Sequence, residues 1–182
     1  MTARTRTRPV LAGAALLLAG ASVLPAGSAR AGEPPAPVVA GCTVNGLPVT
    51  GAVVAGTEGF DEIDCAHGVP AGVVVAGGGG VDVITVHGGN AGTVDGGGGA
   101  DMIEINGGNG GRVTGGDGDD LVDLIGDADA NSGIAGGGPG DDVLFLRAGD
   151  IAGTGVVSGD TGSDVCLFDP DPSGARDCEV VV

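Results

Sequence analysis

The sequence lacks lysine, glutamine, tryptophan and tyrosine, and it has only three phenylalanines in 182 residues. Its seven basic residues are all arginine, against 24 aspartates and glutamates, for a net charge of -17. A chain this acidic repels nucleic acids and anionic membranes and attracts cations, which argues against polyanion binding. Without tryptophan and tyrosine there is no aromatic platform for sugar rings, which argues against a polysaccharide-active enzyme.

Long hydrophobic runs are also missing. The longest uncharged apolar stretch, residues 10–24, is shorter than the roughly 20 residues that a membrane-spanning helix needs. Arg4, Arg6 and Arg8 precede it, and the small residues Ala29 and Ala31 follow it. This order predicts a secretory signal peptide over residues 1–31, with an uncleaved membrane anchor as the alternative. A proline-rich linker is predicted over residues 32–41.

Glycine is the most abundant residue, with 41 copies, and 38 of them follow residue 31. Glycine in a helix interior costs about 1 kcal/mol relative to alanine, so a helical bundle is excluded. It does not recur at every third position, so collagen is excluded as well. High charge with much glycine is typical of disorder, but a mean hydropathy of +0.33 shows that apolar residues are available for a core.

A glycine-rich hexapeptide ending in aspartate occurs six times, at intervals of 21, 19, 19, 22 and 22 residues. The copies occupy residues 56–61, 77–82, 96–101, 115–120, 137–142 and 159–164. Apolar residues alternate after each copy, and a small apolar residue lies two positions before it. Alternation of period two predicts strands with one buried face. Each repeat therefore predicts two short strands and two turns.

Two short strands cannot bury their own apolar face, so neighbouring repeats must stack. We expect an all-β fold, a right-handed parallel β-solenoid (β-roll or β-helix) of about six coils over residues 42–182, with N- and C-terminal caps. Stacking places Ile84, Ile103, Val122 and Leu144 in one continuous core column.

Stacking also aligns the last residue of every hexapeptide in what we call the aspartate row: Asp61, Asp82, Asp101, Asp120, Asp142 and Asp164. Neighbouring carboxylates about 5 Å apart repel by roughly 1 kcal/mol in bulk water and about 3 kcal/mol at a protein surface. Ca²⁺ accepts six to eight oxygen ligands in flexible geometry and removes this repulsion, whereas Mg²⁺ prefers a small octahedral site. The alternative is a metal-free solenoid in which the aspartates only cap turns.

The hexapeptides, each followed by an apolar position, resemble the calcium-binding nonapeptide GGxGxDxUx of RTX (hemolysin-type) proteins. The resemblance is to a degenerate version, because the repeats have 19–22 residues rather than 18 and carry the motif at one edge. It implies a parallel β-roll that binds up to five Ca²⁺ ions between successive loops. The implied ligands are the aspartate row with Gly77, Gly79, Gly96, Gly98, Gly115, Asp117, Gly137, Pro139 and Gly159.

Four cysteines in an exported chain predict two disulfides. Cys65 and Cys166 would lie about five coils, or roughly 24 Å, apart, which is too far for a bond. The other long-range pairing, Cys42–Cys166 with Cys65–Cys178, would require both termini to run the length of the solenoid. We therefore expect the pairs Cys42–Cys65 and Cys166–Cys178, each of which would close one end of the solenoid.

Catalytic residues are not indicated. Two histidines, His67 and His87, with no free cysteine do not make a zinc site or a nucleophile–base pair. We therefore expect a secreted, non-enzymatic protein whose partners are calcium ions, with no nucleic-acid partner and no membrane attachment after signal cleavage. The alternative is a metal-independent structural or adhesive cell-surface solenoid that contacts a partner, or itself, through what we call the apolar outer face: Val83, Met102, Leu121, Val143, Phe145 and Val165.

Overall fold

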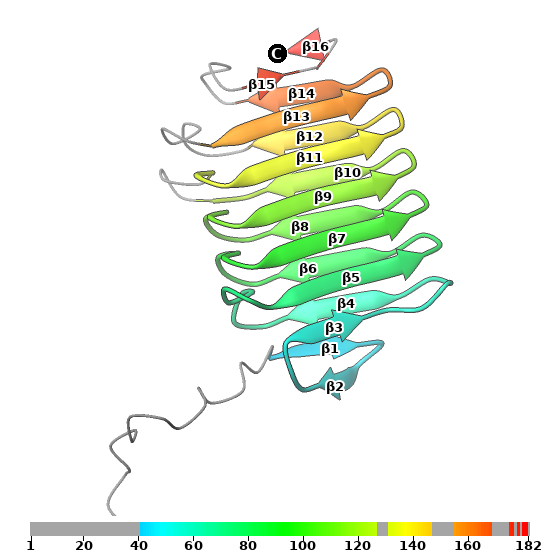
Figure 1. The fold of residues 1–182 in the computed structure, drawn as a ribbon, viewed down its shortest axis with the longest axis vertical. Helices are drawn as coiled ribbons and strands as arrows, with labels where there is room; N and C mark the ends of the chain where they lie inside the picture. The colour runs from blue at the N-terminus through cyan, green and yellow to red at the C-terminus, as the bar shows by residue number, and fades with distance from the viewer. Residues whose placement is uncertain are drawn as a thin grey trace, which may run out of the picture. The chain divides into compact units, whose positions relative to one another are not determined.

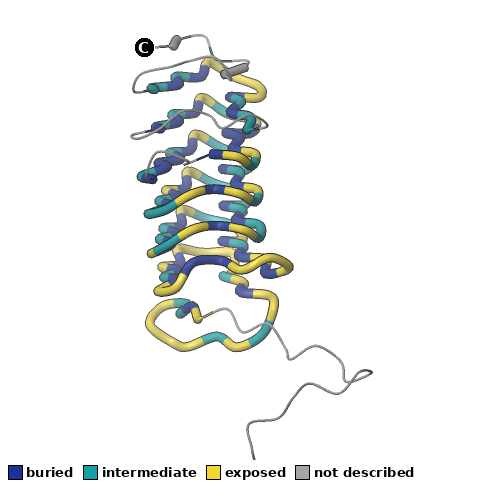
Figure 2. The backbone as a smooth tube through the Cα atoms, turned by 90° about the vertical axis from the view of Figure 1, so that its left-hand side faces the viewer, coloured by how far each residue is buried: buried dark blue, intermediate teal, exposed yellow. Residues whose placement is uncertain are grey.

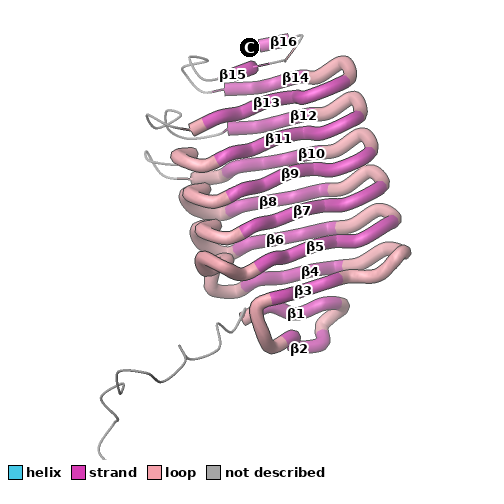
Figure 3. Tube along the Cα trace, viewed as in Figure 1, coloured by secondary structure: helices cyan, strands magenta, loops and turns pink. Residues whose placement is uncertain are grey.

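In the computed structural model the residues described are 41–126, 131–146, 155–168, 175–176, 178 and 180–181. The predicted signal peptide and the predicted linker up to residue 40 lie outside them. The described residues form strands and loops and no helix (Figure 3). Accordingly, no helix capable of crossing a membrane is found in this part of the chain.

The described strands form two sheets (Figure 1). The first, the nine-stranded sheet, contains β1 (Cys42–Val44), β2 (Leu47–Val49), β4 (Glu62–Cys65), β6 (Val83–Val86), β8 (Met102–Ile105), β10 (Leu121–Leu124), β12 (Val143–Leu146), β14 (Val165–Phe168) and β16 (Val180–Val181). The second, the seven-stranded sheet, contains β3 (Val53–Ala55), β5 (Val74–Gly79), β7 (Thr93–Gly98), β9 (Arg112–Asp117), β11 (Ile134–Pro139), β13 (Val156–Thr161) and β15 (Ala175–Arg176).

From β3 onward the chain alternates between the two sheets, and each strand pairs in parallel with the strand one coil further on. Val83, Met102 and Leu121, for example, occupy the same register position in successive coils. The predicted parallel β-solenoid is therefore confirmed. Its six strand pairs, from β3–β4 to β13–β14, span about five full turns, and β15 and β16 extend the C-terminal end.

The core is a set of thin columns between the sheets (Figure 2). Its column members are at most 3 % exposed, and each contributes about 1.5–3 kcal/mol of burial free energy if it is a valine, leucine or isoleucine. The nine-stranded sheet supplies two columns: the first is Ile63, Ile84, Ile103, Val122, Leu144 and Cys166, and the second, two residues further along the strands, is Cys65, Val86, Ile105, Leu124 and Leu146. The seven-stranded sheet supplies the facing column: Val54, Val75, Val94, Val113, Ala135 and Val157.

The glycine-rich hexapeptides are only partly turns. Strand β5 continues from Val74 through Gly79, so the first three residues of the second hexapeptide lie in the strand, and Gly78 and Gly79 pair with the next coil. Most positive-φ glycines of these loops, such as Gly97 and Gly99, direct their missing side chain along the solenoid axis. A Cβ on Gly99 would overlap the carbonyl oxygen of Gly80 in the preceding coil. Glycine is thus required here by coil-to-coil contact as well as by φ.

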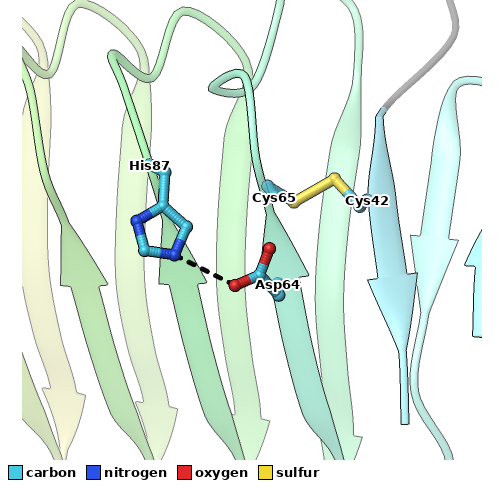
Figure 4. The surroundings of a disulfide bond; sticks show 4 residues. All are labelled: Cys42, Asp64, Cys65 and His87. Carbon is cyan, nitrogen blue, oxygen red and sulfur yellow. Dashed lines mark hydrogen bonds and ion pairs between the residues drawn. A yellow bond between two sulfur atoms is a disulfide. The ribbon is translucent and has the colours of Figure 1, made fainter. Parts of the chain in front are cut away.

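The N-terminal end is closed by an antiparallel hairpin, which the repeat pattern did not predict. Strand β1 pairs with both β2 and β4, and Cys42 lies opposite Cys65. These two cysteines form a disulfide (Figure 4). A second disulfide joins Cys166 to Cys178, so both predicted pairs are confirmed. Two disulfides indicate that the chain folds in an oxidising compartment.

Because coils touch through their glycines, alanine substitution of two adjacent glycines should lower stability by very different amounts. Gly99→Ala should lower the free energy of unfolding by about 2–4 kcal/mol, because it combines a left-handed φ with backbone overlap. Gly98→Ala is the matched control, since a Cβ at Gly98 meets nothing within 4 Å. Urea unfolding followed by far-UV circular dichroism measures both, and equal destabilisation by the two substitutions would contradict the stacking argument.

Candidate functional site

The aspartate row is inside the solenoid rather than on its surface. All six members are at most 3 % exposed, and each lies directly before a strand of the nine-stranded sheet. A hydrogen bond links every consecutive pair: the backbone N–H of Asp82 donates to Oδ1 of Asp101 at 2.7 Å, and the other four pairs repeat this at 2.8–2.9 Å. The row is therefore a continuous, directional element of coil stacking.

The second carboxylate oxygen has a different environment. Oδ2 of Asp82, Asp101, Asp120 and Asp142 is buried and accepts no hydrogen bond. In each loop it faces the first glycine of its own hexapeptide, and a Cβ on Gly77 would lie 2.5 Å from Oδ2 of Asp82. The absence of a side chain at that glycine makes room for the carboxylate. A buried acceptor without a partner is costly, and more so when it is charged.

Backbone carbonyls approach the same place from the neighbouring coil. A Cβ on Gly77 would also lie within 3.0 Å of the carbonyl oxygen of Gly96. In the next coil, a Cβ on Gly96 would likewise lie within 3.0 Å of both the carbonyl oxygen of Gly115 and Oδ2 of Asp101. Carboxylate and carbonyl oxygens of adjacent coils thus converge beside the first glycine. Gly137 and Gly159 likewise face Oδ2 of the aspartate that closes their own loops.

The carbonyls at the third position of the hexapeptide also link neighbouring coils. The carbonyl oxygens of Gly98, Asp117 and Pro139 each accept an N–H from the loop of the preceding coil at 2.7–2.8 Å. Gly79 pairs with Gly98 in parallel register. Each of these three carbonyls keeps one lone pair for a further partner.

Burial raises the pKa of the inner carboxyl groups. The pKa of Asp120 is raised to about 7 and that of Asp142 to about 6, mainly by burial and in addition by neighbouring carboxylates, although a backbone hydrogen bond to each carboxylate acts in the opposite direction. The pKa values of Asp82 and Asp101 are raised for the same first reason, burial. Asp61 differs, because hydrogen bonds from the backbone N–H and hydroxyl of Thr57 lower its pKa.

A second, exposed set of acids lies beside the C-terminal half of the row. Asp119 and Asp141 occupy the fifth position of their hexapeptides. Their carboxylates accept hydrogen bonds from the following coil, whereas those of the aspartate row accept from the preceding coil. Oδ1 of Asp119 accepts the N–H of Asp141, and Oδ1 of Asp141 accepts the N–H of Ser163. These acids are neighbours of the buried row but point into solvent.

No three aspartate, glutamate, histidine or cysteine side chains converge on one point within the described ranges. A cation at the aspartate row would therefore combine few carboxylates with carbonyl oxygens. The histidines lie apart from the row, after the strands of the nine-stranded sheet. Nε2 of His87 is 3.0 Å from Oδ2 of Asp64, and both groups are about half exposed (Figure 4).

Sequence reasoning missed a second buried polar column at the opposite edge of the solenoid, which we call the asparagine ladder: Asn90, Asn109 and Asn131. The side-chain amide of Asn90 donates to Oδ1 of Asn109 at 2.9 Å, and that of Asn109 donates to Oδ1 of Asn131 at 2.8 Å. The amides also donate to backbone carbonyls of the next coil. The intervals of 19 and 22 residues, equal to those of the aspartates, were the available signal.

The apolar outer face is aligned as expected. Val83, Met102, Leu121, Val143 and Val165 share one register column and are partly exposed, while Phe145 lies two positions along β12 in the neighbouring outward column. The seven-stranded sheet also exposes apolar side chains, including Val53 and Ile134.

No protein-family model matches the chain, and neither the curated proteins nor the solved structures include a significant match to it.

The asparagine ladder should be a major source of stability. Asn109→Ala removes a side chain that donates two hydrogen bonds and accepts two, and it leaves buried partners unsatisfied, so we expect a loss of about 2–4 kcal/mol in the free energy of unfolding. Asn106→Ala, which removes a bond to the Glu104 side chain only, should cost less than about 1 kcal/mol. Urea unfolding of the two variants, with their disulfides intact, measures both losses. Similar losses would show that the asparagine ladder contributes no more to stability than the Asn106–Glu104 hydrogen bond.

The raised pKa values predict an unusual pH dependence for the metal-free protein. Between the ordinary aspartate value of 3.8 and about 7, folded Asp120 retains a proton that the unfolded chain has released. The folded state binds more protons in this window, so stability should fall as pH rises through it. The lowered pKa of Asp61 acts in the opposite sense, and only below pH 3.8.

The check is the urea midpoint in chelator at pH 4.5 and pH 7.5, which should be higher at pH 4.5. Asp120→Asn/Asp142→Asn should flatten the difference, because these two groups no longer titrate. A midpoint that rises with pH over this window would contradict the assignment of buried, proton-retaining carboxyl groups.

Proposed function

We propose that the protein is a secreted, non-enzymatic calcium-binding β-solenoid whose folding is coupled to Ca²⁺. The observation that carries the proposal is the buried, unpartnered Oδ2 of Asp82, Asp101, Asp120 and Asp142. At neutral pH each of these carboxyl groups is either protonated, because its pKa is raised, or charged and without a partner for Oδ2. A divalent cation relieves both conditions, because it supplies the missing positive charge.

The donor chemistry supports calcium among the divalent cations. The atoms that converge at the first glycines are carboxylate and carbonyl oxygens, which are ligands for hard cations. Aspartates of the row would supply the charge, and the carbonyls of Gly96 and Gly115 are the nearest neutral donors. Ca²⁺ tolerates the mixed, irregular shell that such loops offer, and Mg²⁺ demands regular octahedral geometry.

The resemblance of the hexapeptides to RTX repeats agrees with this proposal, as does the predicted signal peptide. Extracellular calcium is abundant, and a chain that binds it only in the folded state is stabilised by mass action after export. The oxidising compartment indicated by the two disulfides is consistent with the same route.

The test is a Ca²⁺ titration of the oxidised protein at pH 7.5, followed by far-UV circular dichroism and urea unfolding. We expect Ca²⁺ to raise the urea midpoint and Mg²⁺ at the same concentration to leave it nearly unchanged. Asp101→Asn/Asp120→Asn should raise the Ca²⁺ concentration at half-effect by about tenfold or more, because two inner carboxylates are lost. Asp119→Asn/Asp141→Asn is the matched control, with the same charge change on exposed neighbours.

A stability that is identical in chelator and in millimolar Ca²⁺ would overturn the proposal. An equal effect of the two double variants would show that general charge reduction, rather than the buried row, governs the response.

A metal-independent structural or adhesive solenoid is the second candidate. It is favoured by the row itself, since every Oδ1 already accepts a backbone hydrogen bond or the amide of Asn45, and raised pKa values let inner carboxyl groups carry protons. Such a protein would use the apolar outer face, where Met102 is 42 % exposed.

This second candidate predicts self-association through that face. Met102→Glu/Leu121→Glu should abolish oligomers seen by sedimentation velocity, whereas Thr85→Glu, in the neighbouring outward column, should have a smaller effect. A protein that is monomeric at high concentration, with or without these changes, would contradict association through the apolar outer face.

A further inference from the structure

The first member of the aspartate row is bonded differently from the others. Oδ1 of Asp61 accepts the side-chain amide of Asn45 at 2.6 Å. Its Oδ2 accepts both the backbone N–H of Thr57 at 2.6 Å and the Thr57 hydroxyl at 2.8 Å. Both oxygens of this carboxylate are thus satisfied by protein groups alone, whereas Oδ2 of Asp82, Asp101, Asp120 and Asp142 is not.

Asn45 takes the place of a missing coil. In the rest of the row, Oδ1 accepts the N–H of the preceding aspartate, and Asp61 has no preceding aspartate. Asn45, in the turn between β1 and β2, supplies a donor to that oxygen instead. Its own position is fixed by two bonds to Glu62: its N–H donates to the Glu62 carbonyl at 2.8 Å, and its Oδ1 accepts the Glu62 N–H at 2.9 Å.

The hairpin that carries Asn45 is joined to the first coil by backbone pairing and by a covalent bond. Strand β1 pairs with β4 over three residues, and the Cys42–Cys65 disulfide joins the two strands covalently. The turn uses Asn45 and Gly46 at positive φ, the residue types that a two-residue hairpin turn prefers. The hairpin and the first coil therefore form one unit, in which both carboxylate oxygens of Asp61 accept hydrogen bonds.

We propose that the β1–β2 hairpin and Thr57 close the N-terminal end of the aspartate row without a cation, so that cation binding begins at the second loop. Asp61 is then a capping residue rather than a ligand, and residues 42–65 are an ion-independent template on which the ion-dependent coils assemble. The assignment of ligands rests on the calcium binding proposed above, but the ion-independence of the first coil does not.

Counting bound ions tests the ligand assignment. Native mass spectrometry of the oxidised protein in Ca²⁺ compares the wild type with Asp61→Asn and Asp101→Asn. We expect Asp61→Asn to bind as many ions as the wild type and Asp101→Asn to bind at least one fewer. If Asp61→Asn loses as many ions as Asp101→Asn, Asp61 is a ligand and the inference is wrong. A wild type that binds no ion refutes the proposed function instead.

Asp61→Asn places a side-chain NH2 group next to the Thr57 N–H, so this substitution can itself disturb the first coil. The ion-independent unit is therefore tested separately, by amide hydrogen exchange in chelator. In the wild type, amides of residues 42–65 should exchange about tenfold or more slowly than those of residues 83–105. Asn45→Ala should remove this difference by accelerating residues 42–65. Uniform exchange in the wild type, or unchanged protection in Asn45→Ala, would overturn the capping role.

Discussion

The structure depends on one constraint, the spacing of about 4.8 Å between the paired strands of successive coils. At that spacing any residue type that recurs in register becomes a continuous column. Apolar residues become a core, and glycines become the only residues that allow loop backbones to touch. Polar residues become columns in which neighbouring side chains must satisfy each other's hydrogen-bonding groups. Whether such a column is stable by itself depends on the donors and acceptors that the repeated side chain carries.

The two buried polar columns answer this question in opposite ways. An asparagine side chain has both a donor and an acceptor, so Asn90, Asn109 and Asn131 bond to one another and to backbone carbonyls without outside help. An ionised aspartate has acceptors only, so the aspartate row relies on backbone N–H groups for Oδ1 and leaves inner Oδ2 atoms without partners. The deficit is one of positive charge, and the proposed calcium binding would relieve it.

Periodicity explains why much of this was predictable. The spacing of the hexapeptides and the alternation after each one were sufficient for the parallel solenoid, the core columns, both disulfides and the alignment of the aspartates. The asparagine ladder was missed because the loops that carry it vary in length, and its flanking pattern, a glycine two residues after each asparagine, is hard to see in a chain so rich in glycine. The hairpin was missed because it is not a repeat. The burial of the carboxylates and the capping of Asp61 depend on where each oxygen points, and one sequence does not encode that in a readable pattern.

The central claim is that a cation completes the inner carboxylates, and a crystal structure grown in Ca²⁺ with anomalous diffraction tests it most directly. We expect anomalous peaks about 2.3–2.6 Å from Oδ2 of inner members of the row such as Asp101 and Asp120, and none beside Asp61. Well-defined loops at saturating Ca²⁺ with no anomalous density along the row would contradict the claim.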